Sequence, residues 1–343
     1  MLTISARRLT DVATSIFTAA GATPENAQGV VSSLVDANLA GHDSHGVIRI
    51  SAYVKDIREG RLDPKATPVV VRETASTAVI DGGTTFGQVS SRMAADLAIR
   101  KARAASLAAV AANHCHHTGR IGEWTERVAA AGLVGMATTA GPRGPQSVAP
   151  FGGAKGALGT NPMSWAIPRA AGHPPVLMDY ATSAVAQGKL QVARAKQEPV
   201  PDGCIIDAAG KPTNNVEDFF AGGLLLPFAG HKGYALSVVV ELLSVGLSAG
   251  DKVPAGERAG TVLMVAIDPG AFRPAEEFTK YVESVVARLK AIPPAPGFSE
   301  VLVPGEPEAR TRATRQREGI PVPERTWEGI EATARELGLS VAA

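Results

Sequence analysis

The chain has 343 residues, of which 45% are hydrophobic and 20% are charged, and its formal net charge is +1. These values are typical of a globular protein with about two domains, and the small charge gives no electrostatic reason to expect a nucleic-acid or membrane partner. Only two cysteines occur, Cys115 and Cys204, so a disulfide framework is excluded. Because the chain also lacks a signal-peptide pattern and a membrane-spanning apolar run, we expect a cytoplasmic protein.

The first 41 residues predict two helices. Apolar side chains recur at helical spacing between residues 9 and 20, and Gly21 is a natural end for that helix. Thr23 and Pro24 are typical of an N-cap and a first helical position, so a second helix is expected to run from there to about Gly41. With the helix that follows, these two are expected to form a small helical subdomain.

The third predicted helix, residues 44–60, carries three polar side chains on one face. His45, Arg49 and Tyr53 fall at i, i+4 and i+8, and apolar residues between 47 and 57 form the opposite face. A guanidinium beside an imidazole can hold a carboxylate and protonate a neighbouring oxygen. The same spacing also occurs on ordinary solvated helices, so this segment by itself leaves both interpretations open.

From Thr77 onward, strand and helix signals alternate. Strands are predicted at 78–81, 107–112, 133–139, 163–167, 176–178 and 261–267, and helices at 86–105, 121–131, 183–196, 233–247, 274–290, 307–318 and 324–337. The proline-rich segment 292–297 is expected to be an extended connection to the C-terminal helices. This mixture predicts an α/β or α+β fold whose strand order the sequence leaves open.

Three histidines, His114, His116 and His117, follow directly on the predicted strand that ends at Ala112. A strand-to-loop junction holds side chains rigidly yet within reach of a ligand, which favours a catalytic role. Zinc binding is an alternative, because alternate residues of a strand share a face and histidine suits that metal. No HExxH or CxxC partner accompanies the cluster, however, and histidines that bind loop carbonyls are a third interpretation.

The chain contains neither a GxGxxG fingerprint nor a GxxxxGK[ST] loop. Three other segments combine features of phosphate or ribose binding, namely 150–162, 178–183 and 226–234. The first carries the donors Thr160 and Asn161, and the last carries Lys232, which could meet a pyrophosphate or a 2′-phosphate. Each segment is also compatible with a plain turn or with a helix cap beside a solvated lysine.

Seven short motifs follow one another along nearly the whole chain. They are Asp43-Ser44-His45-Gly46 with Arg49 and Tyr53, His117-Thr118-Gly119, Pro150-Phe151-Gly152-Gly153, Leu158-Gly159-Thr160-Asn161-Pro162, Asp179-Tyr180-Ala181-Thr182-Ser183, Lys232-Gly233-Tyr234 and Pro304-Gly305-Glu306. In this order they resemble the type 2 malate/L-lactate dehydrogenases. That family of NAD(P)-dependent oxidoreductases also includes ureidoglycolate, sulfolactate, diketogulonate and hydroxycarboxylate dehydrogenases and a cyclic-imine reductase.

The resemblance implies a fold unrelated to the Rossmann domain, which agrees with the missing glycine fingerprint. Residues 1–75 and 296–343 would form a helical subdomain on the substrate side, where the family's dimer contact is expected. Residues 76–295 would form a larger α/β domain around a mixed sheet, and this domain would bind the cofactor. The resemblance therefore implies a homodimer of two-part subunits.

The resemblance also implies roles for individual residues. His45, His117 and Asp179 match catalytic positions, and Ser44, Arg49 and Tyr53 match substrate-binding positions. The implied cofactor-binding positions are Gly153, Thr160, Asn161, Asp179, Ala181, Thr182, Ser183, His231, Lys232, Gly305 and Glu306. The cofactor would be NAD or NADP, and no metal is expected. Cys115-His116-His117 and Ala229-Gly230-His231 depart from the family's usual patterns, and Arg120-Ile121-Gly122-Glu123 suggests a hydroxycarboxylate-type subgroup.

The reaction implied is hydride transfer between NAD(P)H and C2 of a small 2-oxo or 2-hydroxy carboxylic acid. Arg49 would hold the carboxylate with two hydrogen bonds, and His45 or His117 would move the proton, with Asp179 as a candidate to orient that histidine. Three alternatives remain at this point, which are a cyclic-imine reductase of the same family, a metal-dependent hydrolase and a non-catalytic nucleotide sensor.

Overall fold

The computed structural model describes residues 1–141, 146–254 and 260–341 of the chain. Its helices are α1 (Ala6–Ala19), α2 (Pro24–Leu39), α3 (Ile50–Arg58), α4 (Gly87–Ala105), α5 (Gly122–Ala130), α6 (Gln187–Lys196), α7 (Val216–Phe220), α8 (His231–Glu241), α9 (Ala275–Lys290), α10 (Glu306–Glu318) and α11 (Glu324–Glu336). Its strands are β1 (Leu2–Ile4), β2 (Val69–Glu73), β3 (Thr77–Asp81), β4 (Leu107–Cys115), β5 (Val134–Ala140), β6 (Met163–Ile167), β7 (Val176–Tyr180), β8 (Ile205–Ile206), β9 (Pro212–Thr213), β10 (Leu224–Leu225), β11 (Gly260–Ile267) and β12 (Ile320–Val322).

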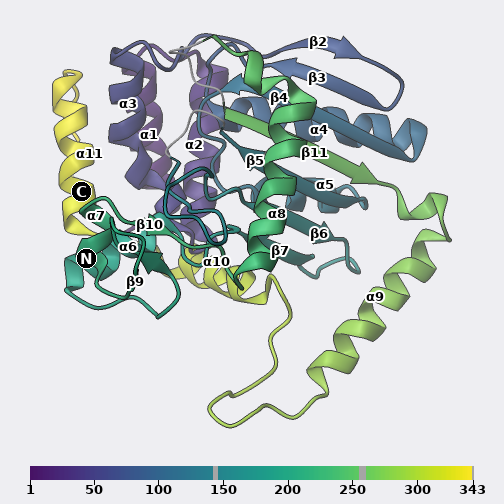
Figure 1. Cartoon of the computed structure of the whole chain (residues 1–343). Coiled ribbons are helices and arrows are strands. Elements are labelled where there is room, and N and C mark those ends of the chain that lie inside the picture. The colour runs from purple at the N-terminus through teal and green to yellow at the C-terminus, as the bar shows by residue number, and fades with distance from the viewer. Residues whose placement is uncertain (142–145, 255–259, 342–343) are drawn as a thin grey trace.

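The largest part is a seven-stranded sheet with the order β2-β3-β4-β11-β5-β6-β7. Strands β3 and β4 are parallel, whereas every other neighbouring pair in this sheet is antiparallel. Helices α4 and α5 cover one face and α8 lies on the other (Figure 1). The predicted α/β fold with a mixed sheet is therefore confirmed, and its mostly antiparallel order differs from the parallel Rossmann sheet.

Small side chains allow α4 to approach the centre of this sheet closely. The buried face of α4 includes Ala94, Ala95 and Ala98, and the strand opposite presents Ala108 and Ala112. Larger side chains from α5 fill the remainder of this core. The packing fixes the C-terminal end of β4, from which the histidine cluster emerges.

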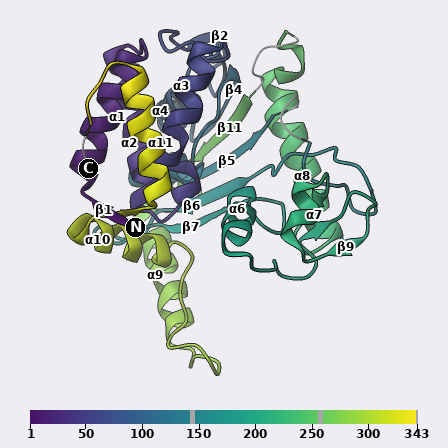
Figure 2. The same ribbon diagram turned by 90° about the vertical axis from the view of Figure 1, so that its left-hand side faces the viewer.

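The helical part stands beside the sheet and is built from both ends of the chain (Figure 2). One core joins apolar side chains of α1, α2 and α3 to those of β12 and α11, including Phe17, Leu34, Ile320 and Trp327. Pairing of β1 with β12 ties the two ends together. The predicted N-cap Thr23 accepts a hydrogen bond from the Asn26 amide, and α2 begins at Pro24 as expected. The domain boundaries at 75/76 and 295/296 stay a prediction, as does the range 296–343, of which the last two residues lie outside the described ones.

Two further pieces extend from the sheet. Between β7 and α8, helices α6 and α7 and strands β8, β9 and β10 form an insertion with its own small core. Helix α9 projects away from the sheet and the chain returns to α10 through residues 291–305, which contain neither helix nor strand (Figure 1). The predicted connection at 292–297 lies in this segment, but it is not extended throughout, because Phe298 donates to the Ala295 carbonyl at 3.0 Å and closes a turn there. No helix in the described ranges combines the length and apolar character that crossing a membrane requires.

The third predicted helix is shorter than expected. Residues 43–45 and 47–49 form two separate 3₁₀ turns, and α3 begins only at Ile50. Gly46 between the turns is extended, with φ −89° and ψ −153°. There the side chain of Asn38 accepts a hydrogen bond from the Val47 amide at 2.8 Å, and a Cβ at position 46 would overlap that side chain. The prediction that His45 shares one helix stripe with Tyr53 is therefore wrong.

Other differences lie at element ends and in short strands. β4 continues three residues beyond its predicted end, to Cys115, and α6 begins at Gln187 rather than at Ser183. β1 and β12 have three residues each and pair only because the chain ends meet, and β2 is an exposed edge strand. Periodicity within the sequence cannot detect strands of this kind, because no buried face repeats along them.

Candidate active site

The two 3₁₀ turns after α2 place Ser44, His45 and Arg49 next to one another. A hydrogen bond of 3.0 Å joins Ser44 Oγ and His45 Nδ1, and Arg49 Nε donates to the Ser44 carbonyl oxygen at 2.7 Å. Arg49 is partly exposed and forms no ion pair with any residue of the described ranges. Its two terminal NH₂ groups are therefore available to a carboxylate ligand.

His117 lies against this group although it is far away in the sequence. The His45 and His117 rings stack with centroids 5.4 Å apart and an interplanar angle of 18°. A hydrogen bond of 2.6 Å joins the Tyr53 hydroxyl to His117 Nδ1, and Gln88 Nε2 donates to the same hydroxyl at 3.0 Å. A phenol oxygen can accept two hydrogen bonds, so the Tyr53 oxygen can take one hydrogen from Gln88 and a second from His117 Nδ1, and these bonds fix the orientation of the His117 ring.

Burial shifts the pKa values of two of these groups in opposite directions. Burial lowers the pKa of His45 to about 3, and the charges of Arg49, His42 and Arg120 act in the same direction. Burial raises the pKa of Tyr53 to about 12. His45 is therefore neutral and Tyr53 protonated between about pH 5 and pH 9.

The other two histidines of the cluster bind carboxylates. His116 is buried, lies 2.7 Å from Asp56 through Nε2, and sets its ring edge against Tyr53 with centroids 5.1 Å apart. His114 lies inside β4 and contacts Asp81 at 2.9 Å. Of the cluster, His117 alone stacks on His45 within the described ranges. No group of three or more His, Cys, Asp or Glu side chains in these ranges is arranged to hold a metal ion.

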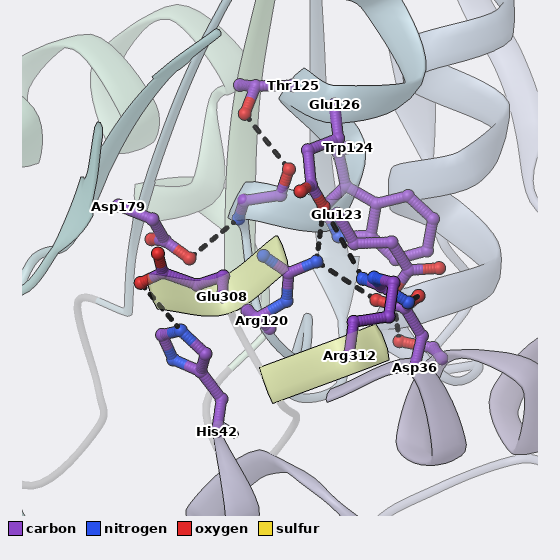
Figure 3. Close-up of polar contacts among 12 residues, drawn as sticks. Asp36, His42, Arg120, Glu123, Trp124, Thr125, Glu126, Asp179, Glu308 and Arg312 are labelled. Atoms are coloured by element: carbon purple, nitrogen blue, oxygen red, sulfur yellow. Dashed lines mark hydrogen bonds and ion pairs between the residues drawn. The ribbon is translucent and has the colours of Figure 1, made fainter. Parts of the chain in front are cut away.

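Asp179 belongs to β7, and its carboxylate lies at the N-terminus of α5. Its Oδ2 atom accepts a hydrogen bond from the Gly122 amide at 3.0 Å, and its neighbours include Arg120 and His42 (Figure 3). Burial raises the pKa of Asp179, and the positive charges of Arg120 and His42 oppose that rise. No hydrogen bond joins Asp179 to His45 in the described part of the chain. Asp179 is therefore linked to His45 through other residues and not by a direct hydrogen bond.

Arg120 is a site residue that the sequence patterns do not identify. Only 1% of its side chain is exposed, and one of its terminal nitrogens binds both Asp36, at 2.9 Å, and Glu126 (Figure 3). Arg312 of α10 binds Asp36 at 2.5 Å and approaches Glu126 at 3.9 Å. We refer to Asp36, Arg120, Glu126 and Arg312 as the ion-pair ring. An arginine within three residues of a predicted catalytic histidine was the available signal.

Beside this ring, Glu123 is a buried carboxyl between α5 and α2. Ser33 Oγ donates to it at 2.5 Å. Burial and the nearby charge of Asp36 raise the pKa of Glu123 to about 7. In the unfolded chain this carboxyl ionises near its ordinary pKa of 4.5, so the stability that it contributes is complete below pH 4.5 and is lost as the pH rises to about 7.

Replacing Glu123 with glutamine is therefore expected to raise stability at pH 8 by up to about 3 kcal/mol and to leave it nearly unchanged at pH 4.5. Urea unfolding followed by circular dichroism at both pH values measures this difference. Glu126→Gln is the matched control on the same helix, because it removes an ionised partner of Arg120 and should destabilise the protein at pH 8. Equal effects of Glu123→Gln at the two pH values would contradict the prediction.

The predicted cofactor segments meet on one side of the sheet. Thr182 donates to the carbonyl oxygens of Thr160 and Asn161 at 3.0 Å through its hydroxyl, and its own carbonyl accepts from Phe228 at 3.0 Å. Ser183 forms a bridge with Pro227, and Ala181 links Thr182 to β7. Three segments that are distant in sequence thus form one framework.

Several side chains in this framework are already occupied. Asn161 donates to Ser237 and Glu241 of α8, and the Ser183 hydroxyl donates to the Val185 carbonyl. Gly153 closes a turn by donating to the Pro150 carbonyl at 2.8 Å. Because these polar groups are already hydrogen-bonded, the residues contribute mainly to the structure of the framework.

The start of α8 fits an anionic group. The helix begins behind Gly230 with no side-chain cap, and His231 and Lys232 in its first turn are exposed. The Lys232 and Gly233 amides already donate to the Ala229 and Phe228 carbonyls, so the exposed side chains of His231 and Lys232 are the groups at this helix end that a nucleotide phosphate can meet. The ring of Phe151 meets His231 edge-on at 5.9 Å. This arrangement suits the phosphates of a nicotinamide dinucleotide.

Gly305 and Glu306 lie at the opposite end of β7. Gly305 packs on Leu177, where any Cβ would be 2.9 Å from the leucine Cβ. The Glu306 carboxylate accepts hydrogen bonds from Lys290 at 2.9 Å and from the Val303 amide at 3.0 Å. In the described structure both residues therefore hold the start of α10 against the sheet.

Comparison with known proteins places these residues in a family. The sequence profile described as malate/L-lactate dehydrogenase matches residues 4–331. The chain belongs to the malate/L-lactate dehydrogenase family. It is thus an oxidoreductase of the 2-hydroxy acid dehydrogenase class, which uses a nicotinamide cofactor, and the metal-dependent hydrolase alternative is wrong.

Relatives and solved structures of the family agree with the fold. Hydroxycarboxylate dehydrogenase B of Escherichia coli K12 is 39% identical over 335 residues, which cover 95% of this chain and 91% of that protein. L-sulfolactate dehydrogenase of Methanocaldococcus jannaschii is 34% identical, with 94% and 93% covered. The solved structure of a putative malate/lactate dehydrogenase from E. coli superposes with a TM-score of 0.93 at 37% identity, covering 99% of this chain and 96% of that one.

Proposed function

We propose that the chain transfers a hydride between NAD(P)H and C2 of a small 2-oxo or 2-hydroxy carboxylic acid. The observation that carries this proposal is the position of Arg49, whose terminal NH₂ groups are available beside the His45–His117 stack. The names of the relatives support the substrate class, because hydroxycarboxylates and sulfolactate are small 2-hydroxy acids. A cation next to an imidazole pair suits an acid whose reacting oxygen is adjacent to its carboxylate.

Arg49 orients the substrate in this proposal. Its Nε is already bound to the Ser44 carbonyl, so the guanidinium plane is fixed before substrate arrives. The two terminal NH₂ groups then hold the substrate carboxylate, which places C2 and its oxygen next to the stacked imidazoles. Ser44 contributes the carbonyl that fixes Arg49 and a hydroxyl that fixes His45. The nicotinamide cofactor, when bound, gives or accepts the hydride.

His117 moves the proton in this proposal. Tyr53 binds its Nδ1 atom, so we assign Nε2 to the substrate: the His117 imidazolium passes its Nε2 proton to the carbonyl oxygen during reduction, and the neutral ring takes the hydroxyl proton back during oxidation. His45 stays neutral, since its pKa is lowered to about 3, and it binds the substrate through hydrogen bonds. Asp179 stays a predicted catalytic residue that acts through Gly122 and Arg120.

The cofactor is proposed to lie along the framework of 160–161, 181–183 and 227–232. His231 and Lys232 would receive its phosphates at the start of α8, and the backbone near Thr182 would face its ribose. Gly153, Thr160, Asn161, Ala181 and Ser183 would form the walls, and Gly305 and Glu306 would hold β7 in place. The 2′-phosphate is the one difference between NADPH and NADH, so parallel titrations with both decide the preference.

We also propose that the protein is a cytoplasmic homodimer. Both cysteines are free and buried, which suits a reducing compartment. Large apolar side chains are exposed just after α8, where Leu242 and Leu247 are 65% and 57% exposed, and on α9, where Tyr281 is 59% exposed. Exposed apolar side chains of this size favour a subunit contact at these elements, which differs from the helical part first expected. Light scattering during gel filtration measures the mass.

A panel of 2-oxo acids and cyclic imines, each assayed with NADH and NADPH by absorbance, tests the proposed function. We expect oxidation of at least one of the two cofactors with a 2-oxo acid. Turnover of cyclic imines alone would assign the chain to the imine-reducing branch instead. Binding of the cofactor without turnover of any substrate would contradict the proposal and indicate a nucleotide-binding protein.

A further inference from the structure

We propose that Arg120 is a positioning residue, whose buried guanidinium faces the Asp179 carboxylate across Gly122 and, through its ion pairs, keeps the turn that carries His117 in its working arrangement. This inference rests on the proposed function, because it concerns the same site. Arg120 does not reach the substrate position itself, since only 1% of its side chain is exposed.

The ion-pair ring accounts for one half of the Arg120 guanidinium. A single terminal nitrogen serves both Asp36 of α2 and Glu126 of α5, and Arg312 of α10 serves the same two carboxylates. Burial works against a charged Arg120, but Glu126 and Asp36 outweigh it and raise its pKa above the ordinary value. Arg120 is thus permanently charged and fixed by elements from both parts of the molecule.

The other half of the guanidinium points to Asp179. The second terminal nitrogen and Nε are buried and have no hydrogen-bond partner in the described part of the chain. A Cβ built on Gly122 would lie 2.7 Å from that terminal nitrogen and 2.5 Å from Asp179 Oδ2. Guanidinium and carboxylate therefore converge on the space that a side chain at position 122 would fill (Figure 3). Only glycine permits this approach.

Arg120 also fixes the turn that connects it to His117. Between them lie Thr118, whose carbonyl accepts from Trp124 Nε1 at 3.2 Å, and Gly119. A Cβ on Gly119 would be 3.2 Å from Gln88, the residue that donates to Tyr53. Because these contacts leave the turn little freedom, a displacement of Arg120 would also displace the His117 ring.

The charges that face Asp179 determine how its carboxylate titrates. They are Arg120 before α5, Glu126 on α5 and His42 after α2, and His42 contacts Glu308 of α10 at 3.6 Å. Arg120 has the largest stabilising effect on the ionised Asp179 carboxylate in this set, and its guanidinium is permanently charged. Moving this positive charge away from Asp179 should therefore make the carboxyl harder to ionise.

Three variants separate this role from a purely structural one. Gly122→Ala adds one methyl group between Arg120 and Asp179 without removing a charge, and alanine favours helix formation by about 1 kcal/mol. Arg120→Lys keeps a cation for Asp36 and Glu126 but has no second NH₂ group to present to Asp179. Arg312→Met is the matched control, because it removes the other guanidinium of the ion-pair ring and does not face Asp179.

We expect Gly122→Ala and Arg120→Lys to lower kcat about tenfold or more, with KM changed less than about threefold. The acid limb of their kcat–pH profiles should move to higher pH. In Arg312→Met, kcat and the acid limb should stay at the wild-type values while the melting temperature falls. Wild-type kcat and pH profiles in a folded Gly122→Ala protein would overturn the proposal, even if Arg120→Lys does not fold.

A titration that needs no turnover distinguishes failure of this proposal from failure of the proposed function. Carbon-13 spectra of labelled aspartate carboxyls, with the Asp179 signal assigned from Asp179→Asn, report its ionisation directly. The midpoint for Asp179 should rise in Arg120→Lys and Gly122→Ala and stay constant in Arg312→Met. An equal midpoint in all four proteins would reject the role of Arg120, whether or not the wild type reduces a 2-oxo acid.

Discussion

Replacing His117 with asparagine is expected to lower kcat by about a thousandfold while binding of the nicotinamide cofactor is kept. Asparagine retains a hydrogen-bonding side chain of similar length but cannot exchange a proton near neutral pH. The reason for choosing His117 is its bond to the Tyr53 hydroxyl, which engages Nδ1 and orients the ring beside His45. Steady-state rates and fluorescence titration with NADH and NADPH measure the two properties separately.

His45→Asn is the matched comparison for this experiment. Since burial lowers the pKa of His45 to about 3, its charge does not change between pH 5 and 9, and we expect KM to rise more than kcat falls. Tyr53→Phe should reduce kcat about tenfold, because it removes the group that orients His117. A His117→Asn enzyme with nearly normal kcat, together with an inactive His45→Asn enzyme, would transfer the proton-moving role to His45.

Substituting lysine for Arg49 is expected to lower kcat/KM about a hundredfold, mainly through KM. The Arg49 side chain has two tasks in this site, because Nε holds the Ser44 carbonyl while the terminal NH₂ groups face the substrate. A lysine ammonium can perform one of them but not both. The measurement is steady-state kinetics with the preferred 2-oxo acid over a range of substrate concentrations.

Arg58→Lys at the end of α3 is the control for this change. Arg58 is exposed and pairs with Glu336 at the end of α11, away from the histidine stack, so kinetics should not change. The melting temperature at low and high salt is a second test, and it should differ little between Arg58→Lys and the wild type, because an exposed ion pair contributes little to stability. A kcat/KM for Arg49→Lys within threefold of the wild type would contradict the role of Arg49 as the carboxylate ligand.

Much of the fold follows from local patterns in the sequence. Helices α1 and α2 are predicted by apolar spacing and by the cap at Thr23, and the central strands β3 to β7 are predicted within a few residues. Caps and helix faces involve residues three or four positions apart, so the sequence states them directly. The motifs around His45, His117 and Asp179 likewise indicate the family without reference to structure.

The sequence could not show how the site residues meet. Tyr53 and His117 are 64 positions apart, and Ser33 and Glu123 are 90 positions apart. Contacts over such separations depend on the path of the whole chain, which no local period records. Arg120 illustrates the same difficulty, because its partners come from α2, α5 and α10 and only the folded chain brings them together.

The sequence alone thus determined the kinds of chemical groups and their grouping into motifs, because residue type and short spacing are local properties. Tertiary structure decided that Gly46 interrupts the expected helix stripe, that His117 rather than His114 or His116 reaches His45, and that Gly122 leaves room for Arg120 beside Asp179. The physical reason is the same in each case. Steric fit and buried charge pairing are settled only when distant segments pack against one another.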